Sequence, residues 1–137
     1  MNFKNFAWIA VAVVVAGLGG WIYGASGSSA REQARLVEEQ RADMAEVRAH
    51  ILEGRVSLFL SNFGDASRHF ESARTVLERV QSRLRETAQA ERAGRLQIPI
   101  SHLRDAQHLS SAFDPAAHTA AGDALSALTD VYGPAGL

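Results

Sequence analysis

Five histidines are the residues of this sequence whose chemistry suits a cofactor or metal site. They are spread along the chain at His50, His69, His102, His108 and His118. A helical bundle can bring two imidazoles together around haem or a metal ion. However, the chain has no Glu-x-x-His pair of the kind that builds di-iron sites. Glu46 and His50 are one helical turn apart and predict a surface ion pair. We therefore expect no cofactor and no metal, and keep a small haem- or metal-binding bundle as an alternative.

Other catalytic patterns are missing from the sequence. The chain has no cysteine, which excludes thiolate ligands, cysteine nucleophiles and disulfides. Ser101 and His102 adjoin, but no strained strand-to-helix turn presents the serine as a nucleophile. No glycine-rich loop ends in Lys followed by Ser or Thr, so a phosphate-binding loop is not predicted. The net charge of −1 gives no bulk attraction to nucleic acid. We expect no catalytic residue, no small-molecule substrate and no nucleic-acid partner.

An apolar stretch near the N-terminus predicts a helix that crosses a lipid bilayer once. Residues 6–23 carry no charged side chain, and as a helix they would span roughly 27 Å, about the thickness of the hydrocarbon layer. Trp8 lies near one end, and Trp21 and Tyr23 lie at the other. Such rings favour the two membrane interfaces. The segment therefore predicts a membrane helix that lacks any imidazole or carboxylate for a cofactor or an ion path.

Small residues recur at every fourth position of this segment. They are Ala12, Ala16, Gly20 and Gly24. On a helix they form one stripe, which lets another membrane helix approach closely. The stripe predicts docking against integral membrane protein subunits, although alanine and glycine are also generally common in membrane helices.

The first 25 residues are predicted to stay attached as a signal anchor. Lys4 precedes the apolar stretch, and the small residues 28–30 resemble a cleavage site. The apolar stretch is longer than the apolar region of a signal peptide, which has roughly 7–15 residues, and this favours an uncleaved anchor.

Thirteen of the fourteen basic residues are arginine, a bias that indicates a GC-rich bacterial genome. We expect a protein of the bacterial inner membrane with its C-terminal domain in the periplasm. Basic residues from Arg31 onward leave the opposite orientation open.

The rest of the chain predicts only helices. Residues 26–48 are expected to form a Gly/Ser hinge and a charged helical stalk, and residues 49–137 a helical-hairpin domain. Four helices are predicted at about 30–63, 65–93, 101–112 and 115–132, with Gly64 as a helix breaker, Asp65 as an N-cap and Gly133 as a stop. The second helix has the clearest pattern, an apolar stripe in alternating steps of four and three residues. Its members are Ala66, Phe70, Ala73, Leu77, Val80 and Leu84. The predicted fold class is all-α: a transmembrane helix followed by a four-helix antiparallel domain.

Part of this domain resembles a tetratricopeptide repeat. The matching residues, about 54–80, are a small residue in the first helix, an aromatic at the turn, and the Ala-x-x-x-aromatic-x-x-Ala pattern of the second helix. They are Gly54, Phe63, Ala66, Phe70 and Ala73, followed by Leu77 in the same predicted hairpin core. Glu53 departs from the pattern because an apolar residue is usual there, and Val80 replaces the closing proline. The resemblance implies protein–protein binding, and no residue carries over as a peptide clamp.

These features predict a non-catalytic, single-pass accessory or scaffolding subunit of a larger membrane complex. Photosynthetic and respiratory complexes are the hosts considered, and no residue selects one. The first alternative is a membrane-anchored, tetratricopeptide-like adaptor that binds peptides or assembly partners transiently. The second alternative is the small haem- or metal-binding bundle.

Overall fold

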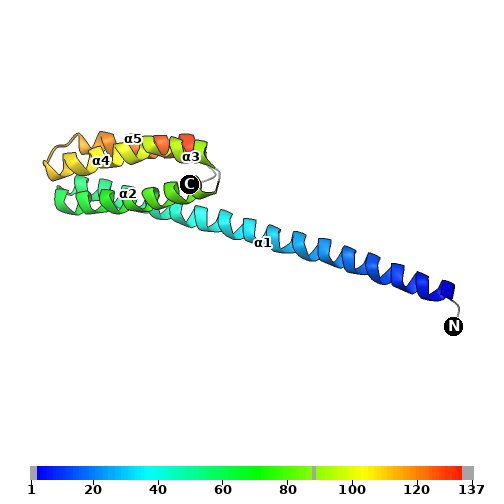
Figure 1. Ribbon diagram of the computed structural model, residues 1–137. Helices are drawn as coiled ribbons and strands as arrows, with labels where there is room; N and C mark the ends of the chain where they lie inside the picture. The colour runs from blue at the N-terminus through cyan, green and yellow to red at the C-terminus, as the bar shows by residue number, and fades with distance from the viewer. Residues whose placement is uncertain (1–2, 88, 134–137) are drawn as a thin grey trace. The chain divides into compact units, whose positions relative to one another are not determined.

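The structure, a computed structural model, is all-α. It describes the backbone of residues 3–87 and 89–133, and the side chains of these ranges from Ala30 onward. Within that part of the chain there are five helices and no strand (Figure 1). The helices are α1 (Phe3–Phe59), α2 (Phe63–Glu86), α3 (Ala90–Arg95), α4 (Gln97–Ser111) and α5 (Ala117–Tyr132). The expected all-α class and four main helices are confirmed, and α3 is an additional short helix.

The chain divides into two compact units, Met1–Glu38 and Glu39–Leu137. In the first unit, the described side chains from Ala30 onward are exposed, including Leu36 and Val37. The predicted membrane segment at residues 6–23 lies within the bounds of α1, but its side chains are outside the described residues. Within the part of the chain whose side chains are described, no helix is long and apolar enough to cross a bilayer. The predicted Gly/Ser hinge at the start of residues 26–48 also lies within the bounds of α1.

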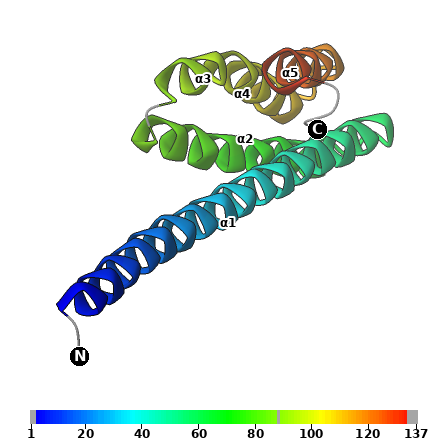
Figure 2. The same ribbon diagram turned by 90° about the vertical axis from the view of Figure 1, so that its right-hand side faces the viewer.

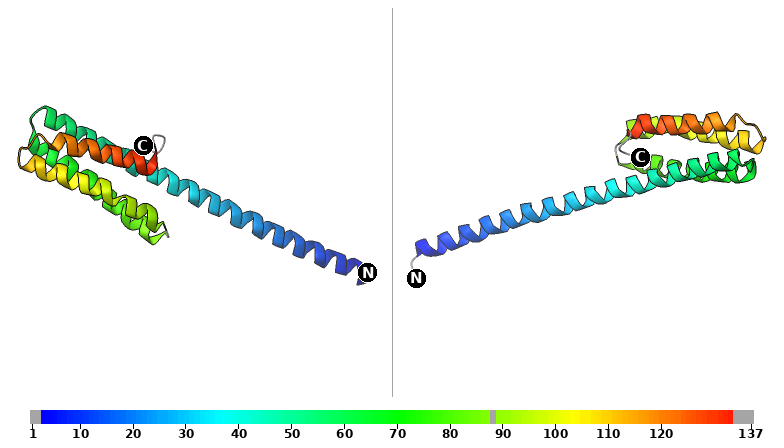
Figure 3. Two further views of the ribbon diagram at one scale, coloured as in Figure 1. Left: turned by 90° about the horizontal axis from the view of Figure 1, so that it is seen from above. Right: turned by 180° about the vertical axis from the view of Figure 1, so that it is seen from behind.

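The core of the second unit begins with two facing apolar stripes. On α1 the stripe is Met44, Val47, Ile51, Gly54 and Leu58, at alternating steps of three and four residues, and all five are buried. On α2 the predicted stripe from Ala66 to Leu84 is buried as expected. The C-terminal part of α1 and α2 therefore form an antiparallel hairpin, visible in Figures 2 and 3. Met44 and Val47, which the sequence reading placed in the stalk, belong to this core.

The turn between α1 and α2 is earlier than predicted. Ser61 has a φ of 59°, and Asn62 is the N-cap, whose side-chain oxygen accepts a hydrogen bond from the Asp65 backbone N–H at 3.3 Å. Asp65 is therefore inside the first turn of α2 rather than its cap, and Gly64 is helical. The prediction was wrong because Asn62 can cap a helix as well as Asp65 can, and it comes first.

The predicted long second helix is interrupted after Glu86. The Thr87 hydroxyl donates to the Arg83 carbonyl at 3.0 Å, and α3 begins at Ala90. Buried Gln81 on α2 donates through Nε2 to the Ala93 carbonyl at 2.9 Å, which ties α3 back to α2. Gly94, which comes directly after the predicted end of the second helix at residue 93, is inside α3 instead.

Helices α4 and α5 form the second hairpin and complete the core. Pro99 is in the first turn of α4, where its missing N–H leaves no helical bond unmade. The Asp114 carboxylate accepts a hydrogen bond from the Ala116 backbone N–H at 2.8 Å just ahead of α5. Helix α5 ends before Gly133, whose φ is 72°, as the sequence predicted. Its buried face consists of small residues and one leucine, Ala117, Ala120, Ala121, Ala124 and Leu128.

Candidate functional site

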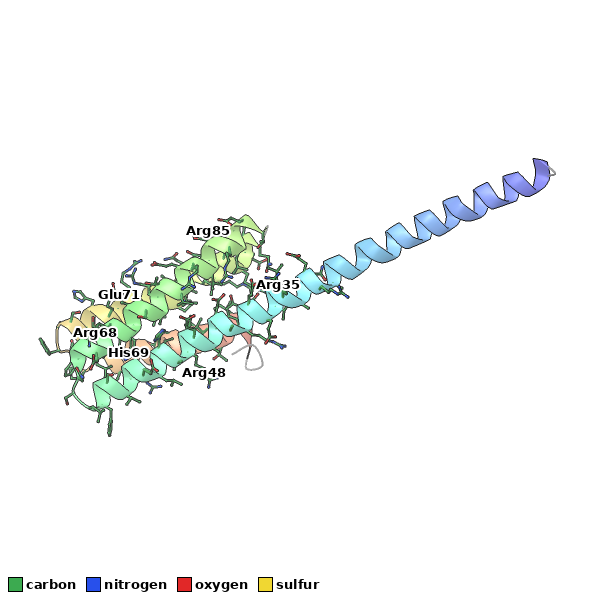
Figure 4. All side chains as sticks on the ribbon, turned by 90° about the horizontal axis from the view of Figure 1, so that it is seen from below. Arg35, Arg48, Arg68, His69, Glu71 and Arg85 are labelled. Carbon is green, nitrogen blue, oxygen red and sulfur yellow. The ribbon has the colours of Figure 1, made fainter. Side chains whose placement is uncertain are left out.

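Two histidines and one carboxylate meet where α1 crosses α2. His50 and Glu53 are three residues apart on α1 and therefore share one side of this helix. His69 comes from α2, and it lies where that helix runs beside α1 (Figure 4). One ligand atom from each of the three side chains lies within 4.8 Å of the other two. We call these three residues the His–Glu cluster.

A close helix crossing positions the His–Glu cluster. A Cβ atom added at Gly54 would lie 2.5 Å from Cε1 of Phe70, so only glycine leaves room for this ring against the α1 backbone. Gly54 follows Glu53 in the chain, and Phe70 follows His69. Because Phe70 is fully buried, the backbone that carries His69 is held by the core. The crossing thus brings Glu53 and His69 within reach of each other.

The distances in the cluster centre on one carboxylate oxygen. Glu53 Oε2 lies 3.1 Å from Nδ1 of His69 and 3.4 Å from Nδ1 of His50. His50 Nδ1 is buried, and it has no hydrogen-bond partner among the described residues. On the other side of the same ring, Nε2 lies 4.0 Å from the Glu46 carboxylate. The two imidazoles are about one-third exposed and the Glu53 side chain is 55% exposed, so the cluster is open to small solutes.

The sequence reading missed this grouping. The sequence predicted the Glu46–His50 pair, which the structure contains. For metal ligands, only the Glu-x-x-His spacing was considered, and the reverse His-x-x-Glu spacing was not. The spacing of His50 and Glu53 was therefore the available signal on α1, whereas the contribution of His69 depends on the helix crossing. Two of the other histidines, His102 and His108, line an open hollow between α4 and α5 and are not part of the cluster.

A different face of α1 carries an exposed apolar stripe. It repeats at steps of four and three residues, the spacing of a coiled-coil seam. Its members are Ala45, Ala49, Leu52, Val56 and Phe59, and all five are exposed. The three large side chains are 42%, 58% and 83% exposed in chain order. We call this face the outer stripe. The outer stripe is thus a second apolar pattern on α1, in addition to the buried stripe from Met44 to Leu58 that packs on α2.

The outer stripe continues onto an apolar end of the second unit, Glu39–Leu137, which we call the compact unit. Leu60 and Phe113, both largely exposed, lie in the two loops at that end. The rings of Phe63 and Phe113 contact edge to face, with centroids 5.7 Å apart. Phe113 has a φ of 59°, an unusual value for an aromatic residue. The α1–α2 turn and the α4–α5 loop lie at the same end, as Figure 3 shows in two views. Their exposed side chains make this end apolar.

The other predicted site residues divide into two groups. In the predicted hairpin core, Gly54, Ala66, Phe70, Ala73 and Leu77 are buried, and Phe63 is partly buried against the core. The predicted membrane residues lie outside the part of the chain whose side chains are described. These are Trp8, Ala12, Ala16, Gly20, Trp21, Tyr23 and Gly24.

Comparison with known proteins finds no relative for this chain. No protein-family model, no curated protein and no solved structure matches it.

Proposed function

We propose that this protein is a non-catalytic subunit of a membrane complex that holds a helix of a partner protein against α1. The observation that carries the proposal is the outer stripe. Burial of Leu52, Val56 and Phe59 against a partner would contribute roughly 1.5–3 kcal/mol for each side chain fully covered. The a/d spacing favours an amphipathic helix as the bound element.

The N-terminal sequence supports attachment of this subunit to a membrane. Residues 6–23 are apolar and long enough to cross a bilayer. A membrane anchor that precedes the outer stripe in the same chain favours a partner that is itself an integral membrane protein. The stripe of small residues from Ala12 to Gly24 then supplies a second docking face within the bilayer. The bacterial inner membrane, with the compact unit in the periplasm, is the proposed location.

Co-purification with a matched pair of variants tests the outer stripe. Val56 on α1 and Ile98 on α4 are both β-branched, and their exposed fractions are 58% and 59%. The full chain, carrying a C-terminal tag, is extracted in mild detergent as wild type, Val56→Arg and Ile98→Arg. We expect a stoichiometric membrane partner with the wild type and Ile98→Arg, and its loss with Val56→Arg. Since both positions are exposed, folding should change by less than about 0.5 kcal/mol.

The same experiment distinguishes the alternatives. Recovery of the partner in equal amount with Val56→Arg would refute the outer stripe as the docking face. A partner that is captured only by cross-linking, and is lost on washing, would favour the tetratricopeptide-like adaptor. Gly20→Leu tests the membrane stripe separately, because a bulky side chain there should release the complex while circular dichroism of the compact unit stays unchanged.

A further inference from the structure

We propose that the His–Glu cluster binds one divalent transition-metal ion of the zinc class and thereby links α1 to α2. The ligands are Nδ1 of His50, Nδ1 of His69 and Oε2 of Glu53. Two imidazoles and one carboxylate suit zinc and the neighbouring transition metals, whereas calcium and magnesium prefer oxygen ligands alone. The site lies on a different face of α1 from the outer stripe, so it stands independently of the proposed docking.

Two of the three distances between ligand atoms are close to those of a tetrahedral site, and the third is within 4.8 Å. A zinc ion holds nitrogen and oxygen ligands at ~2.0–2.2 Å, which places adjacent tetrahedral ligands roughly 3.3–3.6 Å apart. The two distances from Glu53 Oε2 to the histidine nitrogens are 3.1 and 3.4 Å. These atoms are therefore close enough to share one ion after small side-chain adjustments.

The polar groups around His50 also fit a metal ligand. Its Nδ1 is buried without a hydrogen-bond partner among the described residues, and a bound ion would use that lone pair. Its Nε2 faces the Glu46 carboxylate at 4.0 Å. In metal sites the second ring nitrogen of a histidine commonly faces a carboxylate, which orients the ring and raises its basicity. Nδ1 of His50 thus faces the cluster without a hydrogen-bond partner in the described part of the chain, and Nε2 of the same ring faces the Glu46 carboxylate.

The core fixes the backbone positions of the three ligands before any ion binds. Each ligand is followed in the chain by a buried residue of the hairpin: Ile51, Gly54 and Phe70. Three protein ligands leave a fourth tetrahedral position for water or another small ligand, and the half-exposed Glu53 leaves that position open to solvent. Because the ligands come from two helices, a bound ion cross-links the hairpin and should stabilise it by an amount that grows with the logarithm of the ion concentration above the dissociation constant.

Zinc titration of the full chain tests the site. The protein is purified in detergent with a tag that contains no histidine, treated with a chelator and titrated with Zn²⁺ by calorimetry. The variants His50→Gln, His69→Gln and Glu53→Gln each remove one ligand. His108→Gln, which removes a histidine far from the cluster in sequence, is the matched control. We expect one ion per chain, and an affinity that falls roughly tenfold or more in each ligand variant but not in the control.

Thermal unfolding supplies a second readout that does not depend on calorimetry. Excess Zn²⁺ should raise the midpoint of the wild type and of His108→Gln, and should leave that of His69→Gln unchanged. Circular dichroism before the titration establishes that each variant is folded. The proposal is overturned if the wild type binds no Zn²⁺ at concentrations up to ~1 mM, a very weak affinity, or if the ligand variants bind as tightly as the control.

Discussion

The close approach at Gly54 can be tested by a single added methyl group. In Gly54→Ala the new Cβ would lie 2.5 Å from Cε1 of Phe70 and 2.9 Å from Cδ1 and Cζ of the same ring. Ordinary contact between carbon atoms needs about 3.5–4.0 Å, so the two groups must separate by about 1 Å. Phe70 is fully buried, and its ring has no solvent to move into. We therefore expect the α1–α2 hairpin to be strained.

The expected magnitude follows from two opposing terms. Overpacking a filled core usually destabilises by about 1–3 kcal/mol. Alanine in place of glycine within a helix offsets about 1 kcal/mol of this. Because the clash is with a ring enclosed by the core, we take the upper part of the range and expect a net loss of roughly 2 kcal/mol. For a unit of this size, that corresponds to a fall of roughly 8–16 °C in the unfolding midpoint.

Urea and thermal unfolding, followed by circular dichroism, measure this effect against a matched control. Gly122 is inside α5, and an added Cβ there meets no atom within 4 Å. Gly122→Ala should therefore stabilise by about 0.5–1 kcal/mol. In the double variant Gly54→Ala/Phe70→Leu, the smaller side chain should recover part of the loss. If Gly54→Ala were as stabilising as Gly122→Ala, the close crossing, and with it our account of how the His–Glu cluster is positioned, would be refuted.

Three further predictions concern the other contacts of the compact unit. Gln81→Ala removes the bond to the Ala93 carbonyl, and we expect a loss of about 1–3 kcal/mol in urea unfolding, with faster amide exchange in α3. Burial raises the pKa of Tyr132 above its ordinary value of 10.0. The contribution of the Tyr132 hydroxyl to stability is therefore present below pH 10 and lost as the pH rises through the folded-state pKa. Unfolding midpoints across pH 9–12 should decline less in Tyr132→Phe than in the wild type. Asn62→Ala removes the α2 cap seen at the Asp65 N–H and should lower the free energy of unfolding by about 1 kcal/mol in a denaturant titration.

Local sequence pattern predicted the helices better than it predicted their ends. The stripe from Ala66 to Leu84 identified the buried face of α2, because residues three and four apart lie on one side of a helix. The stop at Gly133 was also correct, since a glycine with positive φ ends a helix locally. The break after Glu86 was missed. Beyond the break, the Gln81 side chain bonds to the Ala93 carbonyl, and no local pattern shows that these two residues meet.

The sequence by itself determined the all-α class, the main helices and which face of α2 is buried, because each of these follows from side-chain spacing within one helix. It also contains the apolar stretch at residues 6–23, on which the proposed membrane attachment rests. Only the tertiary structure decided that His69 lies beside Glu53 and that the outer stripe on α1 is exposed. Both outcomes depend on the register of α1 against α2, and that register is set where Phe70 packs on the bare backbone of Gly54.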